Sequence, residues 1–215
     1  MSEYGTYAQA EKYLGEDFIP PECLGRHFNK SFAKNFQYSQ EQLAHLADTV
    51  PHVSMLIWAQ ENQHILAPGP ISDLCLLDVS KLESDLFIGP ADHSGWWEDE
   101  TFPQSDCVNK GEWLLARKAD VPNSRSKRWD EQSELIAASE YVPNVAEVAY
   151  GMLVYYKVKG IRLFPDHYVN TSSVDTRGFQ VKIGCFGQHG ISVPFLFTAG
   201  RRASNIGICS ARTLR

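Results

Sequence analysis

A run of apolar residues at helical spacing, in the last third of the chain, is the feature that most restricts its fold. Asn144 is a favoured N-cap residue, Glu147 follows three positions later as its capping-box partner, and Gly160 suits the left-handed position that ends a helix. Six apolar residues between these signals recur on one helical face: Val145, Val148, Ala149, Met152, Leu153 and Tyr156. The spacing predicts a helix over 144–160 whose Met and aromatic side chains belong to the core and not to a cofactor site.

The segments around this helix predict the fold class. A strand is expected at 112–118 and a helix at 127–140, and four extended segments follow the central helix, at 161–173, 178–187, 190–199 and 205–214. Helices followed by a run of strands are typical of an α+β domain, here two helices packed on a twisted antiparallel sheet. The last strand needs a partner, and 112–118 is the natural one, so the first and last strands of the domain should pair.

The first half of the chain carries weaker signals. Capping boxes at Thr6–Gln9 and Ser39–Gln42 predict helices at 7–14 and 40–48. The segments 52–59 and 64–67 read as a hairpin and 73–79 as another strand, whereas the polar, Gly- and Pro-containing stretch 89–112 predicts a long loop or a domain junction. We therefore divide the chain into an N-terminal region, 1–108, for display or support, and a C-terminal domain, 109–215.

The overall composition is that of an ordinary globular protein. The 215 residues carry a net charge of −6, 43% are hydrophobic, and no apolar run approaches the roughly 20 residues of a membrane span. The N-terminus lacks the basic and apolar regions of a secretory signal. The expected location is the cytoplasm, a virion or the end of a non-classical export route.

Positive charge gathers at the C-terminal end. After Asp175 the chain contains no acidic residue, but it contains six basic ones: Arg177, Lys182, Arg201, Arg202, Arg212 and Arg215. A basic end can indicate a nucleic-acid partner. These charges are dispersed and follow no helical pattern, so a nucleic-acid binder that uses this segment is kept as an alternative.

Candidate catalytic and metal-binding residues are sparse. The five scattered cysteines show no metal-ligand spacing, and the isolated His167 and His189 have no second ligand near them in sequence, so we predict no metal and no cofactor. His93 lies among polar neighbours in 89–107, but residues adjacent on one loop cannot form a triad with each other. The protein is expected not to be an enzyme, with an enzyme that uses the 89–107 loop or a cysteine as the alternative.

The segment 191–198 alternates like a strand with one ordinary face and one unusual face. Ile191, Val193, Phe195 and Phe197 form an apolar face that should be core. Ser192, Pro194, Leu196 and Thr198 form a second face without charge, and it carries a proline, which cannot donate to a sheet. A face of this kind fits positions that the fold does not need.

The residue types missing from the tail share a genetic property. Lys, Glu, Gln, Met and Trp make up 42 of the 215 residues, so roughly five would be expected after Gln188, but those 27 residues contain none. None of these five amino acids has a codon that ends in a pyrimidine. A segment written largely in codons ending in C or T would lack all five.

The tail resembles a known family. The stretches "RLFPDHYVNTSSVDTRGFQVKIGCFGQHGISV" and "RRASNIGICSARTL" resemble the C-terminus of the variable proteins of diversity-generating retroelements, and "IGICSAR" (206–212) resembles the family's closing pattern. The resemblance covers about 110–215. It implies a C-type lectin-like fold of the formylglycine-generating-enzyme type, with paired terminal strands and an exposed face diversified by error-prone copying at adenines. The Glu-Pro-Asn and Trp-Asn-Asp calcium motifs of sugar-binding C-type lectins are absent, as is a paired-cysteine catalytic motif.

This resemblance and the strand pattern together select nine candidate residues for the diversified, ligand-binding face. They are Cys185, His189, Ser192, Pro194, Leu196, Thr198, Ala203, Ser204 and Asn205. Such positions must accept almost any side chain, which requires outward placement on a rigid scaffold. A flat exposed face suits a protein or other macromolecular ligand better than a small molecule. An irregular sheet without a binding role is the simpler alternative.

Overall fold

The computed structural model describes residues 4–28, 33–88, 94–195 and 202–214. The α-helices are α1 (Tyr7–Leu14), α2 (Pro21–His27), α4 (Gln40–Asp48), α5 (Val53–Glu61), α6 (Leu76–Leu82), α7 (Phe102–Ser105), α8 (Trp129–Ser133) and α9 (Val145–Lys159). Short 3₁₀ turns are η1 (Gly15–Asp17), η2 (Lys34–Phe36), η3 (Ser84–Leu86) and η5 (Ser94–Asp99). The protein is α+β, and among the described helices none combines the length and hydropathy that crossing a bilayer needs.

The strands form three small sheets. The first contains β1 (His64–Pro68), β4 (Trp113–Arg117), β10 (Ala211–Arg212) and β5 (Glu140–Tyr141), in that order. The second pairs β2 (Leu74–Cys75) with β3 (Cys107–Val108). The third has the order β8 (Gly190–Ser192), β7 (Gln180–Gly187), β6 (Tyr168–Val174) and β9 (Ile206–Ile208), and its β6–β9 pair is parallel. The expected single antiparallel sheet is therefore wrong: the strands divide among sheets, because 205–214 breaks at Cys209–Ser210 and its two pieces join different sheets.

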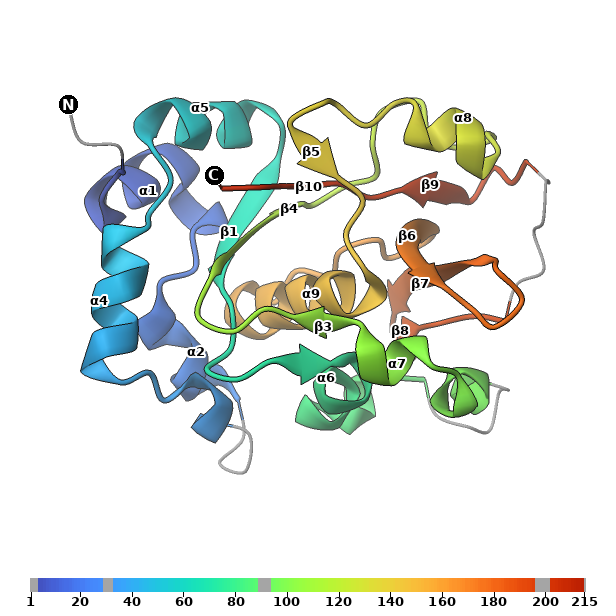
Figure 1. The fold of residues 1–215 in the computed structure, drawn as a ribbon, viewed down its shortest axis with the longest axis horizontal. Coiled ribbons are helices and arrows are strands. Elements are labelled where there is room, and N and C mark those ends of the chain that lie inside the picture. Colours follow the sequence, from blue (N-terminus) through green and yellow to red (C-terminus); the bar gives the residue numbers. More distant parts are fainter. Residues whose placement is uncertain (1–3, 29–32, 89–93, 196–201, 215) are drawn as a thin grey trace.

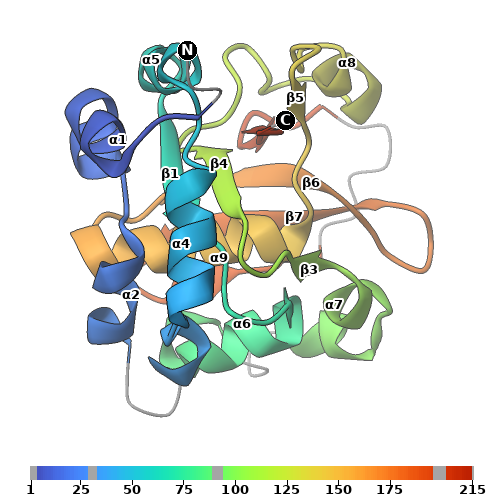
Figure 2. The ribbon, with the colours of Figure 1, turned by 60° about the vertical axis from the view of Figure 1, so that its left-hand side comes forward.

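Helix α9 lies in the middle of the molecule and the other elements surround it (Figure 1). Ten of its 15 residues are buried, so it is covered on all sides and not along one stripe. It packs against β4, β6 and β7 of two sheets and against α2 and α6. Figure 2 shows α6 running below it. The core cluster around α9 has Leu24, Leu76, Tyr150 and Ile183 as fully buried members from four parts of the chain. A second core cluster is formed by α1, α4 and α5 against β1 and β4.

The predicted ends of α9 are confirmed. The Asn144 side chain accepts a hydrogen bond from the Glu147 N–H at 2.9 Å, and the Glu147 carboxylate accepts one from the Asn144 N–H at 2.8 Å. At the other end Gly160 has a φ of 71°, and its N–H donates to the Tyr156 carbonyl. The capped helices α1 and α4 also agree with the prediction.

The predicted pairing of the domain's first and last strands is also confirmed. Ala211 and Arg212 of β10 lie opposite Ala116 and Leu115 of β4 in antiparallel register. On its other side β4 pairs along its whole length with β1, from the N-terminal half. Residues 1–108 and 109–215 thus share a sheet and a core, and the functional division between them stays a prediction.

Several elements of the sequence prediction are wrong. The segment 52–59 lies largely in the helix α5 and not in a hairpin strand, because a short apolar run without clear period fits a helix as well as a strand. Most of 73–79 is the helix α6, which follows directly on the two residues of β2. The helix expected at 127–140 is confined to α8, and the described part of 89–112 contains η5, α7 and β3 in place of an open loop. Residues 89–93 lie outside the described residues.

Asn144→Ala should lower the free energy of unfolding by about 1 to 2 kcal/mol, measured by urea denaturation. The substitution removes the N-cap of α9 and also the hydrogen bond from Asn144 Nδ2 to the Cys107 carbonyl, 3.0 Å long. Ser39→Ala, which removes the cap of the peripheral helix α4, is the matched control and should cost less. Equal effects of the two substitutions would contradict a central role for α9.

Candidate ligand-binding surface

The predicted residues lie on and beside the sheet β8-β7-β6-β9. Its inner side packs on α9 and contains Val169, Ile183, Ile191 and Val193, all buried. Ser192 alternates with these residues and therefore faces away from α9. Leu196 and Thr198 of the nine candidates, and also Phe197 of the predicted core face, lie outside the described residues.

One row of backbone partners crosses this sheet. Ser192 lies opposite Gly184, Gly184 opposite Tyr168, and Tyr168 opposite Ile206. Because neighbouring strands are about 4.8 Å apart, three steps place β8 roughly 14 Å from β9. Cys185 and Asn205 directly flank members of this row, so these two candidates, which are distant in sequence, can contact one macromolecular partner at the same time.

An irregularity in β7 brings Cys185 to this row. The register between β7 and β8 shifts between Gly184 and Gly187, and Cys185 has the left-handed φ of 45°. Gly184 must be glycine, because a Cβ there would collide with the His167 carbonyl oxygen. The bulge keeps Cys185 half-buried at the surface, but it also restricts which residues can replace it.

The side chains of Cys185 and Ser192 both lie next to the phenol of Tyr168. Burial raises the pKa of the Tyr168 phenol, the Cys185 thiol raises it further, and the Ser192 hydroxyl acts in the opposite direction. Phenol, thiol and hydroxyl thus share one polar spot. Ser192 is only 8% exposed, so the expectation that it points freely into solvent is wrong: it lies against its neighbours in the sheet.

The segment 203–205 is held by its backbone. The Ala203 carbonyl accepts the Ser126 N–H at 3.0 Å, and the Asn205 carbonyl accepts the Tyr168 N–H at 2.9 Å. The side chains of Ser204 and Asn205 are exposed and that of Ala203 is half-buried. Their position is therefore fixed by groups that every amino acid possesses.

A buried polar network supports this segment from below. Gln132 of α8 donates through Nε2 to the carbonyls of Ser124 and Ile206, at 2.9 and 3.1 Å. Its Oε1 accepts from Asn170 Nδ2 at 2.6 Å. Gln132 and Asn170 are both buried, so the network fixes the start of β9 relative to β6 and α8.

Charged residues surround the same end of the molecule. His167 lies between the carboxylates of Asp120 (3.3 Å) and Asp166 (2.7 Å). Burial alone would lower the pKa of His167, but its hydrogen bonds to these two carboxylates outweigh burial and raise it. Arg125 forms a bidentate ion pair with Asp120.

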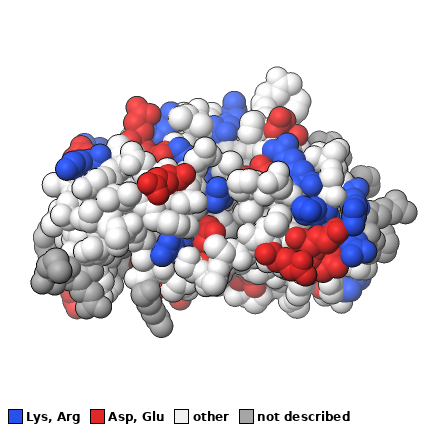
Figure 3. Space-filling model, turned by 90° about the horizontal axis from the view of Figure 1, so that it is seen from above, with Lys and Arg blue, Asp and Glu red and all other residues white. Residues whose placement is uncertain are grey.

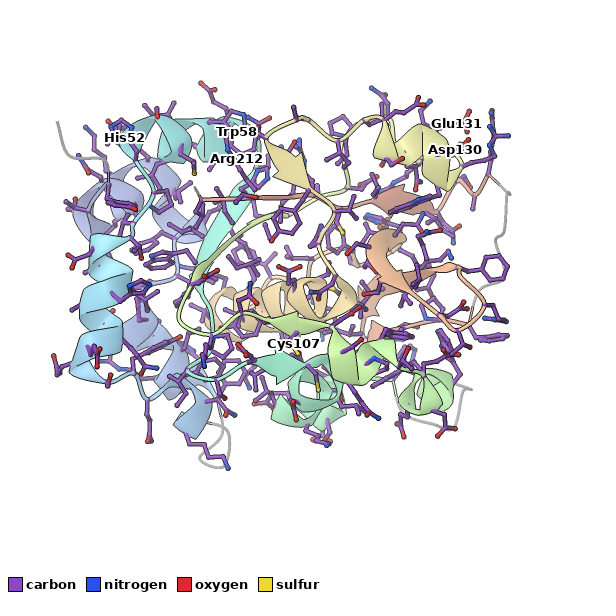
Figure 4. The ribbon with its side chains drawn as sticks, viewed as in Figure 1. His52, Trp58, Cys107, Asp130, Glu131 and Arg212 are labelled. Atoms are coloured by element: carbon purple, nitrogen blue, oxygen red, sulfur yellow. The ribbon has the colours of Figure 1, made fainter. Side chains whose placement is uncertain are left out.

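A second set of ion pairs lies at the helix α8. Arg202, just before the candidate segment, pairs with Glu131 at 2.5 Å, and Arg128 pairs with Asp130 at 3.1 Å. Figure 4 shows Asp130 and Glu131 on this helix. From above, acidic and basic side chains lie beside each other at the α8 end (Figure 3). The surface here is mixed in sign and not uniformly basic.

The apolar face predicted for 191–198 ends earlier than expected. Ile191 and Val193 are buried as predicted, but Phe195 is 52% exposed. The strand β8 ends at Ser192, so the period of two does not govern the residues that follow. Pro194, after the strand, is half-buried.

Phe195 forms an exposed aromatic cluster with residues that sequence reasoning missed. Its ring meets Trp96 edge-on at 5.2 Å between centroids, and the Arg177 guanidinium lies 4.3 Å from its centroid. Trp96 Nε1 donates to the Val193 carbonyl at 2.8 Å, which fixes the indole. The contact between Trp96 and Phe195 spans 99 positions of the sequence, so no local pattern could have predicted it.

A separate cavity of about 460 Å³ lies between β4, β5, β10 and the N-terminus of α9. Tyr141 donates to Glu147 at 2.8 Å in its wall, and burial raises the pKa of that carboxyl. Arg212 also lines it, with its guanidinium 4.1 Å from the Trp58 ring centroid (Figure 4). Its size suits a small molecule. None of the described candidates lines it, so it is a different place from the predicted surface.

The described residues offer little that resembles a catalytic or metal centre. No group of three His, Cys, Asp or Glu side chains within them could hold a metal ion. Burial and the nearby carboxylates raise the pKa of the Cys107 thiol, and burial strongly raises that of Cys209, which disfavours the reactive thiolate in both. His93 lies outside the described residues.

Comparisons with known proteins leave the family open. No family model, curated protein or solved structure matches this chain.

Cys185→Val should lower the free energy of unfolding by about 1 to 3 kcal/mol, because a β-branched residue is strained at a left-handed φ. Cys185→Gly and Cys185→Asn are the matched controls, and both should be near neutral because these residues adopt this conformation readily. Urea unfolding of the three variants measures the difference. If valine were tolerated as well as asparagine, the bulge would not restrict this position.

Proposed function

We propose that this protein is a non-enzymatic binding protein whose C-terminal surface is diversified to recognise macromolecular ligands. In this proposal residues 109–215 adopt a C-type lectin-like fold of the formylglycine-generating-enzyme type. The paired first and last strands, β4 and β10, are consistent with it. So are the absence of Lys, Glu, Gln, Met and Trp after Gln188 and the family resemblance of the tail.

The observation that carries the proposal is the way 203–205 is fixed. Backbone hydrogen bonds to Ser126 and Tyr168 hold the segment, and the Gln132 network holds the strand that follows it. Neither device uses the side chains of Ser204 or Asn205. The segment can therefore change its chemistry without changing its position, which is the property that a diversified binding site requires.

The aromatic cluster at Phe195 favours a protein ligand. Trp and Arg are enriched among the residues that dominate binding energy at protein interfaces, and Phe195 adds exposed apolar area next to both. A single exposed aromatic residue would be ordinary. Here Trp96 is anchored by its hydrogen bond to Val193, so the cluster presents a preformed surface.

The distribution of charge supports this proposal over the nucleic-acid alternative. Four of the basic residues after Asp175 lie in the described part of the chain. Arg177 pairs with Asp175, Arg202 pairs with Glu131, Lys182 is buried, and Arg212 lies against the Trp58 ring. A phosphate backbone is bound chiefly by exposed cations without acidic partners. The scarcity of unpaired, exposed cations among these residues therefore favours a protein over a nucleic acid as the partner.

A library randomised at His189, Ser204 and Asn205 should remain largely folded, because exposed side chains outside the core usually change stability by about 0.5 kcal/mol or less. The matched control library is randomised at the buried residues Ile191, Ile206 and Ile208 of the same sheet, and most of its members should unfold. Resistance to protease on a display system measures both. Equal losses in the two libraries would overturn the proposal.

The gene's surroundings provide an independent test. We expect a near-copy of roughly the last 100 bases of the coding sequence, differing at adenines and lying near a reverse-transcriptase gene. Sequencing of the flanking DNA decides the matter. If neither the repeat nor the reverse transcriptase is present, retroelement diversification is wrong, although the surface could still bind a fixed partner.

A further inference from the structure

Two cysteines lie directly opposite each other across the small sheet β2–β3. Cys75 and Cys107 are antiparallel register partners, next to the pair Leu74 and Val108. Directly opposite residues in a sheet place their side chains on the same face. All five cysteines of the chain are free thiols, and both of these are partly exposed. The sequence separation of 32 positions gives no hint of this juxtaposition.

The hydrogen bonds identify the kind of pair. In a hydrogen-bonded antiparallel pair the two residues exchange both N–H···O bonds. Here the Cys75 N–H donates to Asp78 Oδ2 at 3.2 Å, and the Cys107 carbonyl accepts from Asn144 Nδ2 at 3.0 Å. The Cys75 N–H is therefore directed to Asp78 and not to the Cys107 carbonyl, which is the arrangement of a non-hydrogen-bonded pair. In such a pair the Cα atoms are about 4.5 Å apart, inside the range that a disulfide spans.

We propose that Cys75 and Cys107 are a modification site that takes up a disulfide bond by exchange with a small-molecule disulfide. One protein thiolate attacks the small disulfide and releases one small thiol, leaving a mixed disulfide. The second protein thiolate then attacks the protein sulfur of that intermediate, which forms the Cys75–Cys107 bond and releases the second small thiol. Two protein thiols are oxidised, and one disulfide is reduced to two thiols. This site is independent of the proposed ligand-binding surface.

Little has to move for the bond to form. The Cys75 thiol donates to Asp78 Oδ2 at 2.9 Å, and the Cys107 thiol contacts the Ser105 carbonyl at 3.6 Å. Thiols are weak donors, so rotation of the two side chains gives up little. Burial raises the pKa of both thiols, and Asp78 raises both further, so exchange should be slower than at an ordinary exposed cysteine.

The bond would connect two parts of the molecule that meet at α9. Cys75 immediately precedes α6, whereas the Cys107 backbone receives the side chain of Asn144, the N-cap of α9. Asp106, the neighbour of Cys107, accepts a hydrogen bond from Ser173 of β6. Oxidation would thus fasten α6 to the start of the central helix and to the sheet that carries the candidate surface.

The test is to treat the folded, full-length protein with oxidised glutathione and map its disulfides by peptide mass spectrometry. We expect a cross-linked peptide pair containing Cys75 and Cys107, a loss of about 2 Da, and a midpoint of thermal unfolding raised by roughly 5 to 10 °C, reversed by dithiothreitol. Cys23→Ser should behave like the unmodified chain, whereas Cys75→Ser and Cys107→Ser should lose both the cross-link and the shift.

Several results would overturn the inference. One is a protein that keeps five titratable thiols after treatment. Others are glutathione that stays attached to Cys75 or Cys107 without formation of the bond between them, and a cross-link that forms between other cysteines. If a Ser variant fails to fold, the peptide map of the unsubstituted chain still decides. A Cys75–Cys107 cross-link that forms only after urea is added would also overturn it, because the native register would not be its cause.

Discussion

The burial of α9 on all of its sides is the constraint on which the rest of the structure depends. A helix that is apolar on one stripe needs one partner, but α9 buries residues on every side and needs cover all round. The sheets that contain β4 and β6–β7 supply part of it, and α2 and α6 from the first half of the chain supply more. The N-terminal half is therefore needed for the core as well as for any role in display.

The candidate surface follows from this arrangement. With α9 occupying the inner side of the sheet β8-β7-β6-β9, hydrophobic burial is satisfied there by residues such as Val169 and Ile183. The outer side can then be polar, and it contains Tyr168, Asn170, Lys182 and Ser192. Burial lowers the pKa of Lys182 to about 8, so even the polar side is partly closed. The exposed positions lie at the ends of the strands, where 203–205 and Phe195 are found.

Sequence reasoning succeeded where the signal is local and failed where it is not. Asn144 and Gly160 fix the ends of α9 through contacts within one turn, so the helix could be predicted. The segment 52–59 could not be assigned, because its apolar run has no clear period and its partners lie far away. The exposure of Phe195 depends on β8 ending at Ser192, and the roles of Gln132 and Tyr168 depend on neighbours many positions distant. Those contacts arise from the fold and leave no local pattern.

The nine candidates should not be equally free to vary. Cys185 needs a left-handed backbone and Ser192 is enclosed, so these two positions accept a narrow set of side chains. Ser204 and Asn205 are exposed and are held by backbone atoms alone, so they accept many. Under the proposed function, the surface would combine a constant polar centre at Tyr168 with a variable rim. Affinity for different ligands would then come from the varied side chains of the rim. The constant centre would keep the backbone of the rim in one position whatever side chains it carries.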